Sequence, residues 1–451
     1  MEKQAKLADD PEAPLPIRHI PSQMGEILED HHATANSVFG EVAEDGPNYH
    51  NVGWLGTVAL MMKTQIGLGV LSIPSVFHTL GLVPGVTLLC VVSGIAMWTS
   101  YIVGVFKLKH PQVYGIDDAY WIFVAGSGIL GISISLNAVS GHGTCTAAFV
   151  AISAVISFAF ASIRTLGKIT WVAWLGLVCI IVAVFTVVVS VGIQDRPASA
   201  PQDEPWKADY KIISSPSFAE AIAAVSSLIF ACSATPAYFS IVAEMRDPRL
   251  FTRSLLVSQI AANALYLVVG IVTYYYCGSY VASPALGSAG PLIKRISYGI
   301  ALPGLVASTT IFLHLPSKYI FVRILRRSEH LTSNTFIHWC TWLSCTFGAT
   351  LVSYIIASGI PVFNNLVSLI GALLGAFLAY QPTGCMWLYD NWKFRTDRTL
   401  TWTLMACWSV FIIVIGTFMT VAGTYGAIVG IIESLQASGG SKPWTCVDNS
   451  I

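Results

Sequence analysis

The stretch Lys63-Thr64-Gln65-Ile66-Gly67-Leu68-Gly69-Val70-Leu71-Ser72-Ile73-Pro74 lies inside the first long apolar run of the chain. It holds a cation, two closely spaced glycines and a proline, and each of these weakens a helix at membrane depth. Backbone groups freed there need partners, so such a segment persists only where it faces protein or a water-filled cavity. The stretch predicts an interrupted helix and a candidate binding site, although glycines of this spacing also let two helices approach closely.

The composition is typical of an integral membrane protein. Of the 451 residues, 54% are hydrophobic and only 11% are charged, whereas roughly a quarter are charged in soluble proteins. The mean hydropathy is +0.67. A formal net charge of +0 leaves no basic excess for nucleic acid, which we exclude as a partner.

The ten cysteines are scattered along the chain. Most fall within or at the ends of apolar runs, and Cys446 alone lies in a polar tail. We expect small core residues, with neither a disulfide framework nor a metal site. No cofactor is implied.

Eleven apolar runs near the roughly 20 residues that cross a bilayer follow a polar N-terminal segment. We expect residues 1–50 to be a disordered cytosolic tail, residues 53–432 to form the membrane domain and residues 433–451 to be a short extracellular tail. The predicted helices cover about 54–77, 80–106, 120–140, 144–162, 169–193, 217–243, 254–277, 297–322, 336–358, 364–389 and 400–432.

The placement of lysine and arginine predicts the orientation. With the N-terminus inside, the inner loops collect the basic clusters at 107–109, 164–168, 246–253, 323–327 and 393–398. The outer segments hold fewer basic residues, so the positive-inside rule supports eleven spans with the C-terminus outside.

The sixth run repeats the anomaly of the first. Ser233-Ala234-Thr235-Pro236 interrupts it near its middle, and proline removes a backbone donor and clashes with the preceding turn. Spans one and six are corresponding first helices if spans 1–5 and 6–10 form two repeats, and an odd number of helices makes such repeats inverted. Interrupted segments in matching positions indicate the midplane site of a transporter.

Three motifs resemble those of the amino acid/auxin permease family, also called transmembrane amino acid transporters. They are Gly-Leu-Gly-Val-Leu-Ser-Ile-Pro at 67–74, Glu-Met-Arg-Asp-Pro at 244–248 and Gly-Ser-Tyr-Val at 278–281. The likeness is closest to fungal neutral amino-acid permeases of the methyltryptophan-resistance type, and it extends from about Gly53 to the C-terminus.

The resemblance implies an all-α polytopic membrane protein with a LeuT-like inverted 5+5 repeat, as in amino acid–polyamine–organocation transporters, plus an eleventh helix. It also implies import of neutral aliphatic and aromatic amino acids, usually driven by protons, at the plasma membrane or else the vacuolar membrane. One departure is the short connection after span two, where Asp117-Asp118-Ala119-Tyr120 runs directly into the third helix.

An amino acid offers a carboxylate, an ammonium and a side chain, and each needs a different partner. Backbone N–H groups around Gly67, Leu68, Gly69 and Val70 can bind the carboxylate at the positive end of the following half-helix. Carbonyls around Ile66 and the 233–235 segment can accept from the ammonium. The candidates on this reasoning are Ile66, Gly67, Leu68, Gly69, Val70, Ser233, Ala234 and Thr235, with Asn137, Phe230 and Tyr238 around the substrate side chain.

Three ionisable residues are candidates for ion coupling or gating. Lys63 lies one helical turn before Gly67, and its ammonium would repel sodium, so we predict sodium-independent transport with Lys63 as a fixed or titrating cation. Alternatively, Lys63 snorkels to the cytosolic surface or pairs with Glu244. Glu244 is expected at an inner gate. His314 is a candidate proton carrier or a structural donor.

Other classes of protein fit less well. A channel is disfavoured because no run carries a ring of pore-lining charge, and an enzyme is disfavoured because no catalytic constellation such as Gly-x-Ser-x-Gly occurs. The expected partners are the amino acid, the proton and the bilayer. A transporter-like amino-acid sensor and a sodium-coupled permease remain the alternatives.

Overall fold

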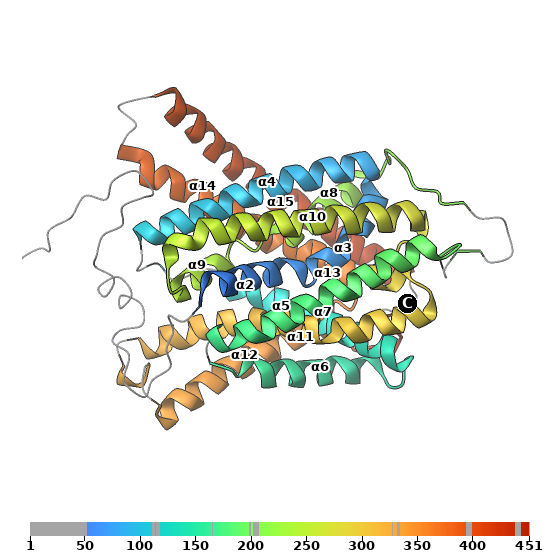
Figure 1. Cartoon of the computed structure of the whole chain (residues 1–451), viewed down its shortest axis with the longest axis horizontal. Helices are drawn as coiled ribbons and strands as arrows, with labels where there is room; N and C mark the ends of the chain where they lie inside the picture. The colour runs from blue at the N-terminus through green and yellow to red at the C-terminus, as the bar shows by residue number, and fades with distance from the viewer. Residues whose placement is uncertain are drawn as a thin grey trace, which may run out of the picture.

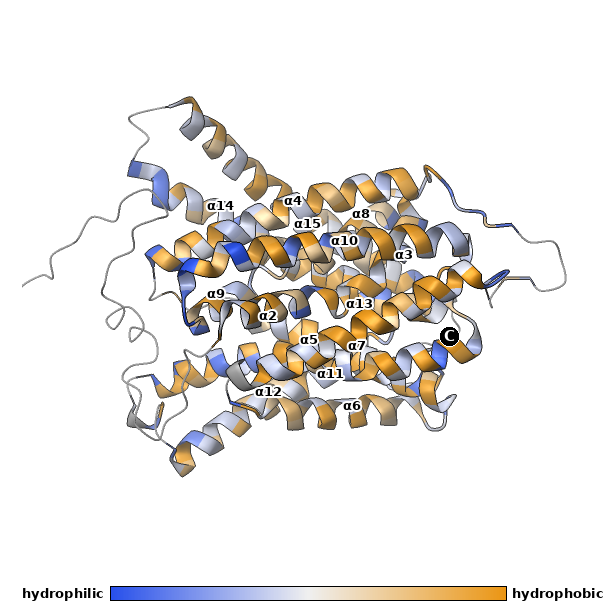
Figure 2. Ribbon diagram, viewed as in Figure 1, coloured by the Kyte–Doolittle hydropathy of each residue, from blue (hydrophilic) through white to orange (hydrophobic). Residues whose placement is uncertain are grey.

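The computed structural model describes residues 52–110, 113, 118–164, 166–197, 200–201, 207–326, 328–331, 334–393, 399–437 and 443–450. The long elements in these ranges are helices (Figure 1). Hydrophobic residues follow most of the helix lengths and hydrophilic ones gather toward the ends (Figure 2). The expected tail at 1–50 lies outside the described residues.

The helices lie along the apolar part of the chain. Among the described residues, nine helices are long and apolar enough to cross a bilayer, and the bent pair α2–α3 makes a tenth. The helix α6 is shorter, with 16 residues. The bounds are α2 (Trp54–Ile66), α3 (Gly69–Leu80), α4 (Leu82–Lys109), α5 (Asp118–Ser140), α6 (Thr146–Ala161), α7 (Leu166–Ile193), α8 (Phe218–Cys232), α9 (Ala237–Glu244), α10 (Phe251–Cys277), α11 (Pro291–Leu325), α12 (Phe336–Gly359), α13 (Phe363–Ile370), α14 (Phe377–Asn391) and α15 (Leu400–Ala437).

Both predicted interruptions are present. The helices α2 and α3 meet at Gly67 and Leu68 with a bend of 41°, and α8 is separated from α9 by residues 233–236. Pro236 precedes the first residue of α9, as expected for a residue that cannot continue the ladder of the preceding helix. The freed backbone groups of spans one and six therefore exist where the sequence predicts them.

The helices pack in two groups that face each other. The first group consists of α2–α3, α4, α8–α9 and α10, and the second consists of α5, α6, α11 and α12. Figure 1 shows α4, α8 and α10 above α5, α11, α12 and α6. We call the end where α2 begins the inner end and the opposite end the outer end, after the predicted orientation.

The tenth run contains a third interruption, which the sequence analysis missed. A π-helical turn, η5 (Gly371–Ala376), joins α13 to α14. A Cβ at Gly371 would lie 1.9 Å from the carbonyl oxygen of Ser226 on α8, so only glycine permits this approach of two backbones. Such turns often occur at functional sites.

The expectation for the cysteines is wrong in two respects. Cys145, at the outer end before α6, forms a disulfide with Cys446 of the C-terminal segment, 301 residues later. A pairing over such a distance leaves no signal in cysteine spacing. In addition, Cys90, Cys340, Cys385 and Cys407 are exposed, not part of the core, because an apolar run presents one face to lipid as well as one to protein.

Candidate functional site

The two broken spans touch at their interruptions. A Cβ on Gly69, the first residue of α3, would lie 2.8 Å from the Cα of Ala231 in the last turn of α8. A side chain at this position would therefore push the two breaks apart. Because Gly69 has no side chain, the interrupted backbones of both spans can meet at this place.

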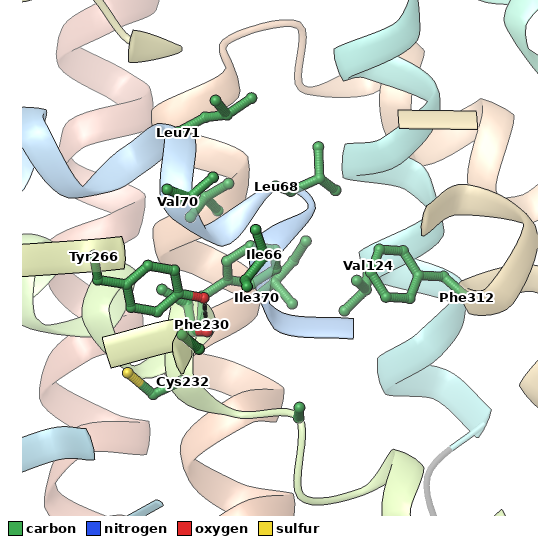
Figure 3. Packing of buried hydrophobic residues seen from close by; sticks show 14 of the residues in the cluster. Ile66, Leu68, Val70, Leu71, Val124, Phe230, Cys232, Tyr266, Phe312 and Ile370 are labelled. Carbon is green, nitrogen blue, oxygen red and sulfur yellow. Dashed lines mark hydrogen bonds between the residues drawn. The ribbon is translucent and has the colours of Figure 1, made fainter. Parts of the chain in front are cut away.

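A small cavity of ≈ 10 Å³ adjoins this contact. This is about the space that one water molecule needs, so a larger ligand requires the walls to move apart. Figure 3 shows Val124 and Phe312 across from the bend that carries Leu68. The lining residues are Thr64, Gln65, Leu68, Gly69, Tyr120, Trp121, Val124, Phe230 and Phe312.

The cavity is closed, and its walls combine polar and aromatic side chains. Every lining residue except Thr64 is buried, so the site is occluded in this conformation. Trp121 and Phe312 stack with ring centroids 5.5 Å apart and planes inclined by 20°. The lining includes no Asp, Glu, Lys or Arg, so the walls suit a ligand that carries no net charge.

Several predicted residues lie at or beside this cavity. Leu68, Gly69 and Phe230 line it, and Ile66 and Val70 are buried in the same broken segment. The carbonyl of Ser233 accepts a hydrogen bond of 2.8 Å from the Tyr120 hydroxyl.

Three predicted residues do not line this cavity. Thr235 shares hydrogen bonds with two hydroxyls of α4, at 3.0 and 3.2 Å, and lines a second cavity between α4, α9 and α14. The hydroxyl of Tyr238 accepts from Gln65 Nε2 at 3.3 Å. Asn137 lies at the outer end of α5, away from the cavity, where its amide donates to Thr146 and Asn449 at 2.9 and 2.7 Å.

Six lining residues were not among the predicted ones: Thr64, Gln65, Tyr120, Trp121, Val124 and Phe312. Thr64 and Gln65 belong to the interrupted stretch at 63–74, so the sequence did contain an indication that they lie at the site. Tyr120 and Val124 lie one helical turn apart and share a face. Nothing local in the sequence indicates that this face meets Phe312.

Lys63 is fully buried beneath the first break. Its Nζ has no hydrogen-bond partner among the described residues, and a Cβ on Gly176 of α7 would lie 3.2 Å from its Cε. The alternative of snorkelling to the surface is therefore wrong, and so is pairing with Glu244. An unpaired ammonium at this depth is costly, and intramembrane ionisable residues of this kind are typical of coupling sites.

Glu244, at the end of α9, pairs with a different cation. Its Oε1 accepts from Lys318 Nζ of α11, and both side chains are almost completely buried. The carbonyl of Glu244 also accepts from Val52 N–H at 3.2 Å, just before α2. Glu244 thus links three elements at the inner end.

His314 is buried on α11, and its ring packs edge-on against Trp342, 5.2 Å between centroids. It does not line the cavity. In the described part of the chain, no group of three or more His, Cys, Asp or Glu could hold a metal ion.

A family model described as transmembrane amino acid transporter protein matches residues 50–115 and 119–429. A protein of Gibberella moniliformis named "Transmembrane transporter" is 33% identical over 427 residues, which are 90% of each chain. The "N amino acid transport system protein" of Neurospora crassa is 30% identical over 428 residues, again 90% of each chain.

Among solved structures, Mhp1, a nucleobase-cation-symport-1 family transporter in a closed conformation with bromovinylhydantoin bound, shares the fold. The TM-score is 0.51 at 13% identity, over 90% of this chain and 98% of that chain. The predicted fold class, an all-α LeuT-like arrangement, is confirmed by this likeness. With most of its length matched by the family model, the chain belongs to the transmembrane amino acid transporter family.

Proposed function

We propose that this protein is a secondary active transporter that imports neutral aliphatic and aromatic amino acids by proton symport with alternating access. The observation that carries the proposal is the meeting of both broken spans at one closed cavity. Paired interruptions at a repeat interface are the arrangement in which secondary transporters hold a substrate.

The chemistry of the cavity supports a zwitterionic substrate. The N–H groups at the start of α3 suit a carboxylate, because a helix N-terminus carries positive partial charge. Carbonyls at the ends of α2 and α8 suit an ammonium. The aromatic pair Trp121 and Phe312 suits an aliphatic or aromatic side chain. The name of the Neurospora crassa relative supports an amino acid as the cargo.

Lys63 supports coupling to protons and independence from sodium. Its ammonium belongs to the helical turn just before Gly67, and a cation in this position cannot ligate sodium and would repel it. The Ser308 hydroxyl of α11, which could otherwise serve a cation, donates at 3.4 Å to the carbonyl of Lys63. A proton is therefore the driving ion that we propose.

The topology that we propose has a cytosolic N-terminus, an extracellular C-terminus and a place in the plasma membrane. The disulfide between Cys145 and Cys446 supports an outer location for both residues, because disulfides persist in oxidising compartments. The loop before α6 and the C-terminal segment then lie on the same side, as the positive-inside rule requires.

The deciding experiment is uptake of radiolabelled phenylalanine and leucine by permease-deficient yeast that express this chain. We expect uptake to rise as the external pH falls, to be the same with and without sodium, and to collapse with a protonophore. Uptake that requires sodium would contradict the proposed coupling. Absence of uptake from cells that carry the protein at their surface would contradict the proposed function.

Substitution Lys63→Met tests the coupling residue. We expect accumulation against a gradient to be lost, while exchange of labelled for unlabelled substrate across the membrane persists, because the cavity itself is intact. Lys109→Met is the matched control, since Lys109 is a half-exposed cation at the end of α4 that pairs with Asp390. Proton-driven accumulation that survives Lys63→Met would remove the coupling role.

A further inference from the structure

Tyr266 of α10 touches both breaks with a single atom. Its hydroxyl lies 2.8 Å from the carbonyl oxygen of Gln65 and 2.9 Å from that of Ala231. Figure 3 shows the Tyr266 ring beside the broken segment, with a dashed line at its hydroxyl. Gln65 and Ala231 are the next-to-last residues of α2 and α8, so the hydroxyl joins the ends of two half-helices.

Two helix C-termini directed at one buried point are unfavourable without a positive partner. Carbonyls in the last turn of a helix lack an intrahelical donor, and the terminus carries a partial charge of roughly −0.5. An isolated buried carbonyl also costs free energy. A bound monovalent cation would be one solution at such a point, and a hydrogen-bond donor is another.

We propose that the Tyr266 hydroxyl occupies the position of a monovalent cation and acts as a positioning residue that holds the two breaks together without an ion. The phenol is buried, and a Cβ on Gly69 would lie 3.1 Å from its oxygen. The hydroxyl thus lies directly at the N-terminus of α3. The proposal gives a second reason, independent of Lys63, for transport without sodium.

One hydroxyl cannot serve both carbonyls fully. It has a single hydrogen, so it donates to one of the two oxygens at a time while keeping its own lone pairs as acceptors. The hydroxyl therefore alternates between the two carbonyls and holds both breaks. The part of the inference that concerns sodium-independent uptake rests on the proposed function.

Substitution Tyr266→Phe removes one oxygen and keeps the ring. Both carbonyls then lack a donor, and the space left beside them is open to water or a small cation. Tyr274→Phe is the matched control on the same helix, because the Tyr274 hydroxyl accepts a hydrogen bond of 2.9 Å from the Lys211 N–H, away from the breaks.

The first measurement is the Tm of the full-length protein, purified in detergent, in choline, sodium and lithium chloride. For the wild type and for Tyr274→Phe, we expect the Tm of each protein to be the same in all three salts. Tyr266→Phe should melt lower in choline and regain stability with sodium or lithium, because an ion that binds only the native state stabilises it. A rise of Tm with sodium that is as large in the wild type as in Tyr266→Phe would overturn the proposal. So would a Tyr266→Phe variant that cannot be purified in any of the three salts.

The second measurement is uptake by the same variants. In choline medium we expect Tyr266→Phe to take up substrate about tenfold more slowly than the wild type, equivalent to about 1.4 kcal/mol, with partial recovery in sodium. Unchanged uptake, or an equal loss in every salt, would overturn the cation-replacing role. If the wild type itself shows no uptake, the proposed function fails while the Tm comparison still decides the role of Tyr266.

Discussion

Gly67 illustrates how one missing side chain positions the site. A Cβ there would lie 2.2 Å from Ser308 Oγ and 2.9 Å from Ser308 Cβ, so the first break lies directly against α11. This closeness lets the Ser308 hydroxyl reach the carbonyl of Lys63. The glycine therefore provides room for contact between the two helix groups, besides weakening the helix.

We predict that Gly67→Ala lowers uptake by at least about tenfold and lowers the Tm, because the new methyl group forces α2 and α11 apart. Ser308→Gly in the same chain should restore part of both quantities by removing the clashing atoms. Gly94→Ala is the control, since its Cβ meets nothing within 4 Å and alanine favours the helix. Uptake by Gly67→Ala at the wild-type rate would contradict the close contact between the first break and α11.

The sequence could predict the part of the site that depends on local backbone chemistry. Leu68 and Gly69 were predicted because glycines and a proline at membrane depth need a functional reason, and Phe230 because it precedes a Pro-interrupted segment. Trp121 and Phe312 were missed because their contact joins segments far apart in the chain. Asn137 was a polar residue of the correct helix, but it lies at that helix's outer end.

At the scale of elements, the inner end is held by contacts among three helices. Val52 N–H donates to the Glu244 carbonyl at 3.2 Å, and Arg246 N–H donates to the Val52 carbonyl at 2.9 Å. These bonds join the start of α2 to the end of α9. The buried pair of Glu244 with Lys318 joins α9 to α11. In the transport cycle that we propose, this pair separates when the inner end opens.

We predict that Glu244→Gln lowers stability by about 3–5 kcal/mol, because removal of one partner leaves a buried charge without its counter-charge. The double variant Glu244→Gln with Lys318→Met should recover most of this loss, since no buried charge remains at the pair. The measurement is the Tm of the purified variants. Equal Tm values for the single and double variants would show that the pair does not stabilise the closed inner end.

The helical elements were predictable because each span carries its own signal. A run of apolar residues near 20 long requires no information from elsewhere in the chain, so the all-helical fold class could be predicted from local sequence. The π-helical turn at Gly371–Ala376 was missed because its glycines resemble those of any closely packed membrane helix. Its cause is the approach of the Ser226 carbonyl, which belongs to another helix.

At the scale of the whole molecule, the C-terminal segment crosses from one part of the bundle to another. The helix α15 packs on α8, α13 and α14, whereas the segment that follows it bonds to the outer ends of α5, α6, α11 and α12. Those bonds run from Asn137 to Asn449, from Thr146 to the Val447 carbonyl, from Lys294 to the Ser450 carbonyl and from the Trp444 N–H to Ser358. The segment thus links the two helix groups.

The disulfide makes this link covalent, so we predict that Cys446→Ser destabilises the protein. The bond closes a loop over a separation of 301 residues, and native disulfides typically contribute about 2–4 kcal/mol by restricting the unfolded chain. We expect a lower Tm for Cys446→Ser and the same decrease for the wild type after reduction, with no further decrease when the variant is reduced. Cys340→Ser is the control, because Cys340 is an exposed free thiol on α12.

The side of the membrane on which Cys446 lies can be tested on intact cells. If Cys446 is extracellular, a membrane-impermeant reductant should expose two additional thiols to a membrane-impermeant maleimide on wild-type cells, and an epitope at the C-terminus should bind antibody without permeabilisation. Thiols that appear only after the cells are opened would place the C-terminus inside. That result would reverse the orientation inferred from lysine and arginine placement, and with it the proposed direction of transport.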